Sequence, residues 1–204
     1  MIKKFIPDKD TLSLPEGVWM DEPDFATWKC ATTGYRCYIV RTALTFSLCG
    51  YVELPARHPL YRVGISDPIF DEFPAQKPFT VHGGLTFADE KIYSEHFFDQ
   101  TPEASWFFGF DCAHHRDFLP ALAANLADKQ IPKEMKELLK MPDATYRDIK
   151  FVKSQVKSLA TQLQSVDINV KSQLDNLGAH SKESDSVVIK ALKETFEQSI
   201  QLTK

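Results

Sequence analysis

Apolar residues recur at intervals of three and four along the last third of the chain. This spacing predicts one long helix with a single apolar stripe, formed by Ile149, Val152, Val156, Leu159, Leu163 and Val166, with Val170 and Leu177 in the same phase. Gly178 ends the run, and a polar loop is expected at 180–186. A second helix is predicted from Val188, Leu192, Phe196 and Ile200.

Two arrangements would bury this stripe. The two helices form a hairpin that packs on the rest of the chain, or the stripe pairs with a second copy as a coiled coil, since its spacing spans about four heptads. The second arrangement would make the protein a homo-oligomer joined through its C-terminal helices. The pattern leaves both open.

The first part of the chain is rich in aromatic and β-branched runs bounded by turn residues. These runs predict strands at 34–41, 44–54, 79–82, 85–87 and 104–111, with a proline-broken loop at 55–78. The strands are expected to pair antiparallel, because a parallel crossover needs about a dozen linking residues.

Two short helices are predicted after the strands. One follows Asp117, with Pro120 in its first turn and Leu119, Leu122 and Leu126 on one face, and the other opens at Pro132. The pattern as a whole predicts an α+β fold, with an antiparallel sheet of about five strands followed by short helices and a long C-terminal helical hairpin. Residues 1–142 would form the α+β domain, and residues 143–204 the hairpin or coiled-coil extension.

Composition and charge narrow the classes of function. The chain has 204 residues, of which 43% are hydrophobic and 25% charged, as in ordinary globular proteins. The net charge is −4, with +1 on residues 143–204 and −5 on the rest, which argues against a dedicated nucleic-acid binder. No apolar run approaches the ~18 residues of a membrane span, and residues 1–7 lack the apolar stretch of a secretory signal. We therefore expect a cytoplasmic protein without a membrane partner.

Cysteine usage agrees with a reducing compartment. Cys30, Cys37, Cys49 and Cys112 include no Cys-x-x-Cys pair, which argues against a zinc ribbon. Most of them have apolar or aromatic neighbours, where a free cysteine behaves as a small hydrophobic residue. Buried thiols are expected, with disulfides as the alternative.

Three stretches, at residues 50–61, 81–87 and 106–117, contain several polar side chains among apolar residues. In the third, a strand ends at Asp111 and a turn leads to a helix, where free backbone N–H groups favour an anion. The last two stretches are expected to lie side by side, because both place polar groups at the ends of apolar strands. The candidate ligand-binding residues are Arg57, His58, His82, Gly83, Gly84, Thr86, Asp111, His114 and Arg116.

Structural roles are alternatives for several of these residues. The Gly83-Gly84 step is also typical of a tight hairpin turn. Asp111 would also serve as a turn cap, and Arg116 would also pair with Asp117.

Catalytic and metal chemistry has weaker support. His82, Asp111 and His114 would suit a two-histidine, one-carboxylate metal set, but no local histidine spacing indicates a metal, and none is assigned. Cys112 would act as a nucleophile only with a nearby base. The glycine motifs of nucleotide-binding loops and the Gly-x-Ser-x-Gly elbow are absent.

Four motifs carry a resemblance: Gly50-Tyr51-Val52, His58-Pro59-Leu60-Tyr61, His82-Gly83-Gly84-Leu85-Thr86, and Trp106 with Gly109-Phe110-Asp111-Cys112-Ala113-His114. The pattern continues into a segment that runs from Tyr146-Arg147-Asp148 to Leu163. In order and spacing they resemble a family of small phage and prophage proteins of uncharacterised function. The likeness covers roughly residues 34–163, and it departs from the family at His115-Arg116, where a smaller residue is expected before the aspartate. The resemblance implies a phage-encoded protein of the host cytoplasm and no mechanism.

Two classes of function remain, and a third is weaker. A non-catalytic phage accessory protein would bind a small anionic ligand, such as a nucleotide, or a host protein, and it is favoured because no nucleophile–base pair is visible locally. The other class is a small hydrolase, with or without a metal, using His82, Asp111 and His114. A partner-binding protein with no pocket is the third. No cofactor is assigned.

Overall fold

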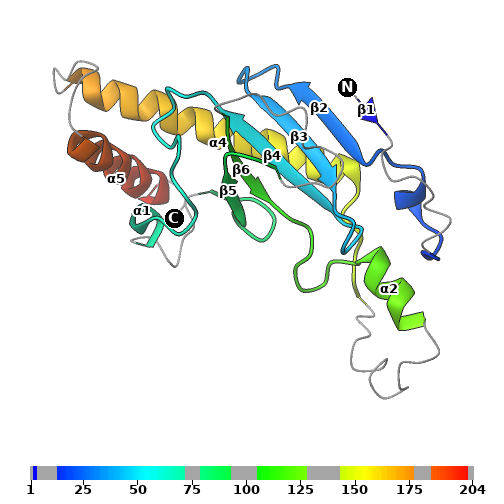
Figure 1. Ribbon diagram of the computed structural model, residues 1–204. Coiled ribbons are helices and arrows are strands. Elements are labelled where there is room, and N and C mark those ends of the chain that lie inside the picture. Colours follow the sequence, from blue (N-terminus) through cyan, green and yellow to red (C-terminus); the bar gives the residue numbers. More distant parts are fainter. Residues whose placement is uncertain are drawn as a thin grey trace.

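One antiparallel sheet with a long helix across one face forms the centre of the molecule (Figure 1). The computed structural model describes residues 2–3, 13–71, 79–92, 105–127, 143–176 and 185–201. The sheet has the order β1-β2-β3-β4-β6-β5. Its strands are β1 (Ile2–Lys3), β2 (Phe25–Lys29), β3 (Arg36–Arg41), β4 (Leu48–Leu54), β5 (Phe87–Asp89) and β6 (Trp106–Phe110). The helices are η2 (Val18–Met20), α1 (Pro68–Asp71), α2 (Pro120–Ala127), α4 (Ile149–Asn176) and α5 (Asp185–Gln201). The predicted α+β class is confirmed.

Most of the predicted strands are present in shortened form. The segments 34–41, 44–54 and 104–111 contain β3, β4 and β6, and the sheet has β1 and β2 in addition. β2 pairs with β3 over its whole length, from Phe25 opposite Val40 to Lys29 opposite Arg36. A five-residue run close behind Pro23 carries little local signal, so this strand depends on its distant partner.

The strand predicted at 79–82 and its Gly-Gly hairpin are wrong. Residues 79–86 form a loop, and β5, which begins directly after it, pairs with β6. The backbone of the loop bonds to glutamines of α4. Thr80 N–H donates to Gln162 Oε1 at 2.7 Å, Gln162 Nε2 donates to the Thr80 carbonyl at 3.0 Å, and His82 N–H donates to Gln155 Oε1 at 2.9 Å. These bonds satisfy backbone groups that a strand partner would otherwise take.

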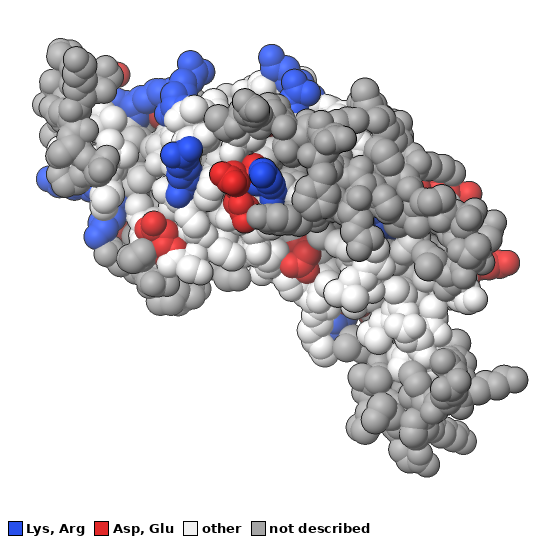
Figure 2. Space-filling model, in the orientation of Figure 1, with Lys and Arg blue, Asp and Glu red and all other residues white. Residues whose placement is uncertain are grey.

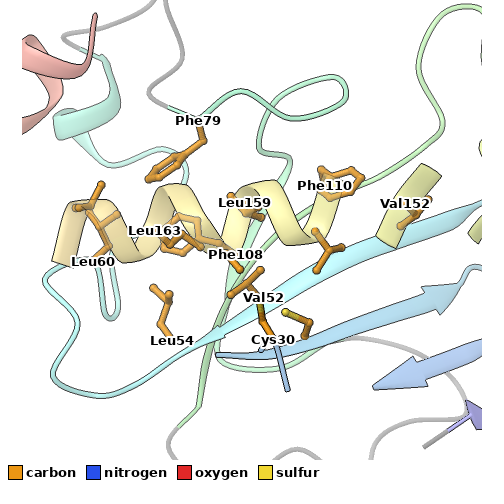
Figure 3. Close-up of a cluster of buried hydrophobic side chains, with 14 of the residues drawn as sticks. Cys30, Val52, Leu54, Leu60, Phe79, Phe108, Phe110, Val152, Leu159 and Leu163 are labelled. Atoms are coloured by element: carbon orange, nitrogen blue, oxygen red, sulfur yellow. The ribbon is translucent and has the colours of Figure 1, made fainter. Parts of the chain in front are cut away.

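The apolar stripe of α4 packs on the sheet of its own chain. Val152, Val156, Leu159 and Leu163 are fully buried, beside Val52 and Phe108 of the sheet (Figure 3). Gly50 of β4 lets the helix approach, because a Cβ there would overlap Val156 and Phe110. Residues of both predicted segments, 1–142 and 143–204, thus contribute to one core.

The other predicted helices have different outcomes. α2 confirms the helix expected after Asp117, and α1 lies inside the stretch expected to be loop. α5 packs against α4, and the ring of its Phe196 lies 6.1 Å from the rings of Phe70 and Phe79. The helix predicted from Pro132 lies outside the described residues, as do Leu177 and Gly178.

A buried arginine joins the N-terminal segment to the start of α4. The Arg41 side chain has no exposed surface, and its Nε donates to Asp24 Oδ1 at 2.6 Å. Its other nitrogens donate to the Phe46 carbonyl, to the Tyr146 hydroxyl at 2.7 Å and to Glu22. Glu22 Oε1 also accepts the Ile149 N–H at 2.7 Å and so caps the first turn of α4.

The surface charges and the cysteines agree with a globular chain. Lys and Arg side chains on the face in Figure 2 are separated by neutral and acidic ones. All four cysteines are free and buried, as predicted. Within the described ranges, the helices are too short or too polar to cross a membrane.

Candidate functional site

Asp117 is the centre of the polar cluster at one end of the sheet. It follows the turn after β6, and its side chain is completely buried. Oδ2 accepts hydrogen bonds from His82 Nε2 at 2.7 Å and from the His114 N–H at 3.0 Å, and Oδ1 accepts from Arg147 Nε at 2.8 Å. We call His82, His114, Asp117, Arg147 and Phe151 the Asp117 cluster.

The hydrogen bonds decide the charge state of Asp117. Burial alone would raise the pKa of this carboxyl, but the bonds from His82, Arg147 and the His114 N–H outweigh burial and lower it. Asp117 is therefore a carboxylate at neutral pH. Its negative charge is matched by the guanidinium of Arg147.

His82 is held on several sides. Its ring lies 5.3 Å from the rings of Phe151 and His114, edge to face, and its backbone N–H is bonded to Gln155. Because Nε2 donates to Asp117, Nδ1 is the acceptor nitrogen of the neutral ring. The ring is thus oriented by a carboxylate, as in many binding and catalytic histidines.

Arg147 is fixed along one edge of its guanidinium. Nε bonds to Asp117, and the group lies over the Phe151 ring at 5.0 Å from its centroid. Among the described residues, none accepts a hydrogen bond from its two η nitrogens, and 27% of the side chain is exposed. Two charged donors therefore remain for a group from outside.

The turns at 81–87 and 111–117 lie side by side, as expected. The backbone N–H of Asp111 donates to Thr86 Oγ1 at 3.1 Å. Gly83 has a positive φ of 66°, and a Cβ there would overlap the His114 ring, so only glycine fits this contact. His114 Nε2 is buried without a hydrogen bond, 3.7 Å from Asp111 Oδ1.

The carboxylate that bonds to His82 is not Asp111, the one grouped with it in the sequence. The bond comes from Asp117, while Asp111 Oδ1 accepts the Ala113 N–H and caps its own turn. Arg147, and not Arg116, pairs with Asp117. Arg116 is exposed and has a positive φ of 69°. The sequence did not identify Asp117 as the central acceptor or Arg147 as a site residue, because no spacing along the chain pairs the two.

Arg57 and His58 lie apart from the Asp117 cluster. His58 is buried, with Nε2 donating to the Leu163 carbonyl at 2.9 Å and Nδ1 accepting the Leu60 N–H at 3.0 Å. Leu163 is twelve residues beyond Phe151 on α4, roughly 18 Å along the helix axis. Seven of the nine candidate residues therefore belong to the sheet end near Asp117, whereas Arg57 and His58 lie apart from it.

Because the His58 ring is buried, we expect the folded protein to lose stability in weak acid. Burial lowers the pKa of His58 below 6.5, so the unfolded chain takes up this proton at a higher pH than the folded chain. The contribution of the neutral His58 ring to the free energy of unfolding is complete above about pH 6.5 and is lost as the pH falls through the folded pKa. We expect urea unfolding between about pH 7.5 and about pH 5.5 to show a shallower pH dependence for His58→Gln than for the wild type. His115→Gln, at an exposed histidine, is the control, and an unchanged slope in His58→Gln would refute the assignment.

Among the described residues, no arrangement of side chains suits nucleophilic or metal chemistry. Burial raises the pKa of the Cys112 thiol, which is 1% exposed, so this sulfur is not an activated nucleophile. In the described ranges, no group of three or more His, Cys, Asp or Glu side chains is placed to hold a metal ion. No protein-family model, curated protein or solved structure matches the chain.

Proposed function

We propose that this chain is a non-catalytic binding protein that holds a small anionic ligand at Arg147 and His82. The observation that carries the proposal is the shared carboxylate of Asp117, which fixes both side chains through hydrogen bonds of 2.8 Å and 2.7 Å. A guanidinium held at Nε presents its two η nitrogens to a carboxylate or phosphate group.

α4 begins two residues after Arg147, and two carboxylates already cap its N-terminus. Glu22 Oε1 accepts the Ile149 N–H and Asp148 Oδ1 accepts the Phe151 N–H, so the helix end offers little to an anion. Because Asp117 already balances the charge of Arg147, an anion is bound here through directed N–H donors more than through net charge.

Calorimetric titration with inorganic pyrophosphate tests the proposal. Wild-type protein is expected to bind, and Arg147→Ala is expected to bind about tenfold more weakly or worse, since a hydrogen bond to a charged group contributes about 1.5–3 kcal/mol. Arg147→Lys keeps the charge and removes the paired donors, so it separates geometry from charge. Arg57→Ala, at an exposed arginine next to His58 and outside the Asp117 cluster, is the matched control. Absence of wild-type binding at millimolar pyrophosphate, or equal losses in Arg147→Ala and Arg57→Ala, would reject the proposal.

A hydrolase is the second candidate, favoured by the bond between His82 Nε2 and Asp117. A histidine oriented by a carboxylate is the usual arrangement of a general base, and Nδ1 would take the proton from a water molecule. Orthophosphate released during the same titration, and lost in His82→Gln, would replace the binding proposal with this one.

The origin and assembly of the protein belong to the same proposal. The resemblance to phage and prophage proteins suggests an accessory factor acting in the host cytoplasm, where a carboxylate of a host protein would be the other occupant of the Arg147 donors. We also propose that α4 and α5 form a helical hairpin within one chain. The contact between the two helices and the buried stripe of α4 support this arrangement over a coiled coil.

A further inference from the structure

Two cysteines meet at one carbonyl group under the turn between β2 and β3. Cys30 directly follows β2 and donates its N–H to the Tyr35 carbonyl oxygen at 2.8 Å. The thiol of Cys37, on β3, lies 3.8 Å from the same oxygen and donates to it. Trp28 is the partner of Cys37 in the strand register, so Cys30 is its diagonal neighbour on the same face of the sheet. Both cysteines belong to the core under α4, where Figure 3 labels Cys30.

The two sulfur atoms have different environments. Burial acts to raise the pKa of Cys30, but hydrogen bonds from Thr33 and the Thr32 backbone, together with the charge of Lys157, outweigh it and lower the pKa. Burial raises the pKa of Cys37 to about 12. Cys30 is thus the thiol that ionises, and Cys37 is the one that stays protonated.

The two cysteines also differ in how closely they approach the solvent. Ala31, Thr32 and Gly34 are exposed, and Cys30 lies directly beneath them with 3% of its surface accessible. Cys37 is completely buried. A small reagent that enters through the turn therefore reaches Cys30 first.

We propose that Cys30 and Cys37 form a redox site, in which a peroxide oxidises Cys30 and the product condenses with Cys37 to an intrachain disulfide. The Cys30 thiolate attacks one peroxide oxygen, the O–O bond breaks, and the released oxygen leaves as water or alcohol after taking up a proton. Cys30 is then a sulfenic acid, oxidised by the two electrons that reduced the peroxide. The Cys37 sulfur attacks Cys30, the S–O bond breaks, and the hydroxyl leaves as water with the Cys37 proton. A dithiol reductant returns the two electrons and restores both thiols.

The geometry also predicts that this disulfide is easily reduced. Diagonal neighbours on one face of an antiparallel pair have Cα atoms roughly 7–8 Å apart, beyond the range of about 4.4–6.8 Å usual for a disulfide, so the bond requires backbone movement. Closing the bond must draw the ends of β2 and β3 together, and strained disulfides are the more oxidising ones.

The test is peptide mapping of the full chain after treatment with hydrogen peroxide and alkylation of the remaining thiols. Trypsin cleaves after Lys29, Arg36 and Arg41, so Cys30 and Cys37 fall in separate peptides, 30–36 and 37–41. The expected result is a disulfide-linked pair of these two peptides, absent after dithiothreitol. In Cys37→Ala, dimedone is expected to trap a sulfenic acid on Cys30, whereas Cys30→Ser leaves Cys37 unmodified.

Cys49 and Cys112 provide the matched control. They also lie close to each other, but burial raises the pKa of both thiols, that of Cys49 to about 12. The double variant Cys49→Ser, Cys112→Ser is expected to form the linked pair as the wild type does. Unlinked, fully alkylated peptides 30–36 and 37–41 after peroxide treatment, or dimedone on Cys49 or Cys112 in place of Cys30, would overturn the proposal. The wild-type map needs no variant, so it decides the proposal even where a serine substitution fails to fold.

Discussion

Replacing Arg41 with alanine is expected to lower the free energy of unfolding by about 3–5 kcal/mol. The guanidinium is wholly buried and donates to four groups: Asp24, Glu22, the Tyr146 hydroxyl and the Phe46 carbonyl. Without it, the carboxylate of Asp24 remains buried and loses its cationic partner, and this desolvated charge is the main cost. Urea unfolding followed by circular dichroism measures the change.

An exposed arginine on the same strand serves as the control. The Arg36 side chain is 61% exposed and 3.8 Å from Glu53, so Arg36→Ala is expected to cost no more than about 1 kcal/mol. Arg41→Lys keeps the charge but cannot reach all four acceptors, so its stability should lie between those of the wild type and Arg41→Ala. A loss in Arg41→Ala as small as in Arg36→Ala would show that the buried network does not stabilise the fold.

Leu159→Ala is expected to cost about 2–5 kcal/mol, because the site is in the middle of the core between α4 and the sheet. Leu159 is completely buried, as is Leu163 on the same helix face (Figure 3). Val156, one turn earlier, is also completely buried. Truncation removes apolar contacts and leaves a cavity that the neighbouring side chains fill only in part. Chemical denaturation gives the free energy, and a lower cooperativity would indicate partial undocking of α4.

The control lies on the opposite face of the same helix. Ile168 is 57% exposed, so Ile168→Ala is expected to change stability by no more than about 0.5 kcal/mol. The pair compares a buried and an exposed apolar truncation on one helix. Equal effects at both positions would contradict the packing of α4 on the sheet.

The two histidines of the candidate site were visible in the sequence, but its central carboxylate and its arginine were not. His82, Asp111 and His114 stood out because polar groups at the ends of apolar runs are unusual. The carboxylate that orients His82 is Asp117, and the cation beside it is Arg147, thirty residues further along the chain. A side-chain bond across such a separation leaves no spacing in the sequence, so only the folded chain could reveal it.

Contacts with residues far along the chain also decide the structure of the loop at 79–86. Its β-branched and aromatic residues favour a strand locally, and that preference is weak, on the order of 1 kcal/mol. The hydrogen bonds that the loop backbone donates to Gln155 and Gln162 override it, and they exist only once α4 is docked.

The sequence by itself determined the α+β class, α4 with its apolar stripe, three central strands and four buried thiols. These features rest on periodicity and composition, which act between near neighbours along the chain. Only the tertiary structure decided that β2 completes the sheet, that the stripe of α4 packs on that sheet, and that Asp117 joins His82 to Arg147. Those outcomes depend on contacts between residues far apart in the chain, and such contacts form only when the whole core closes.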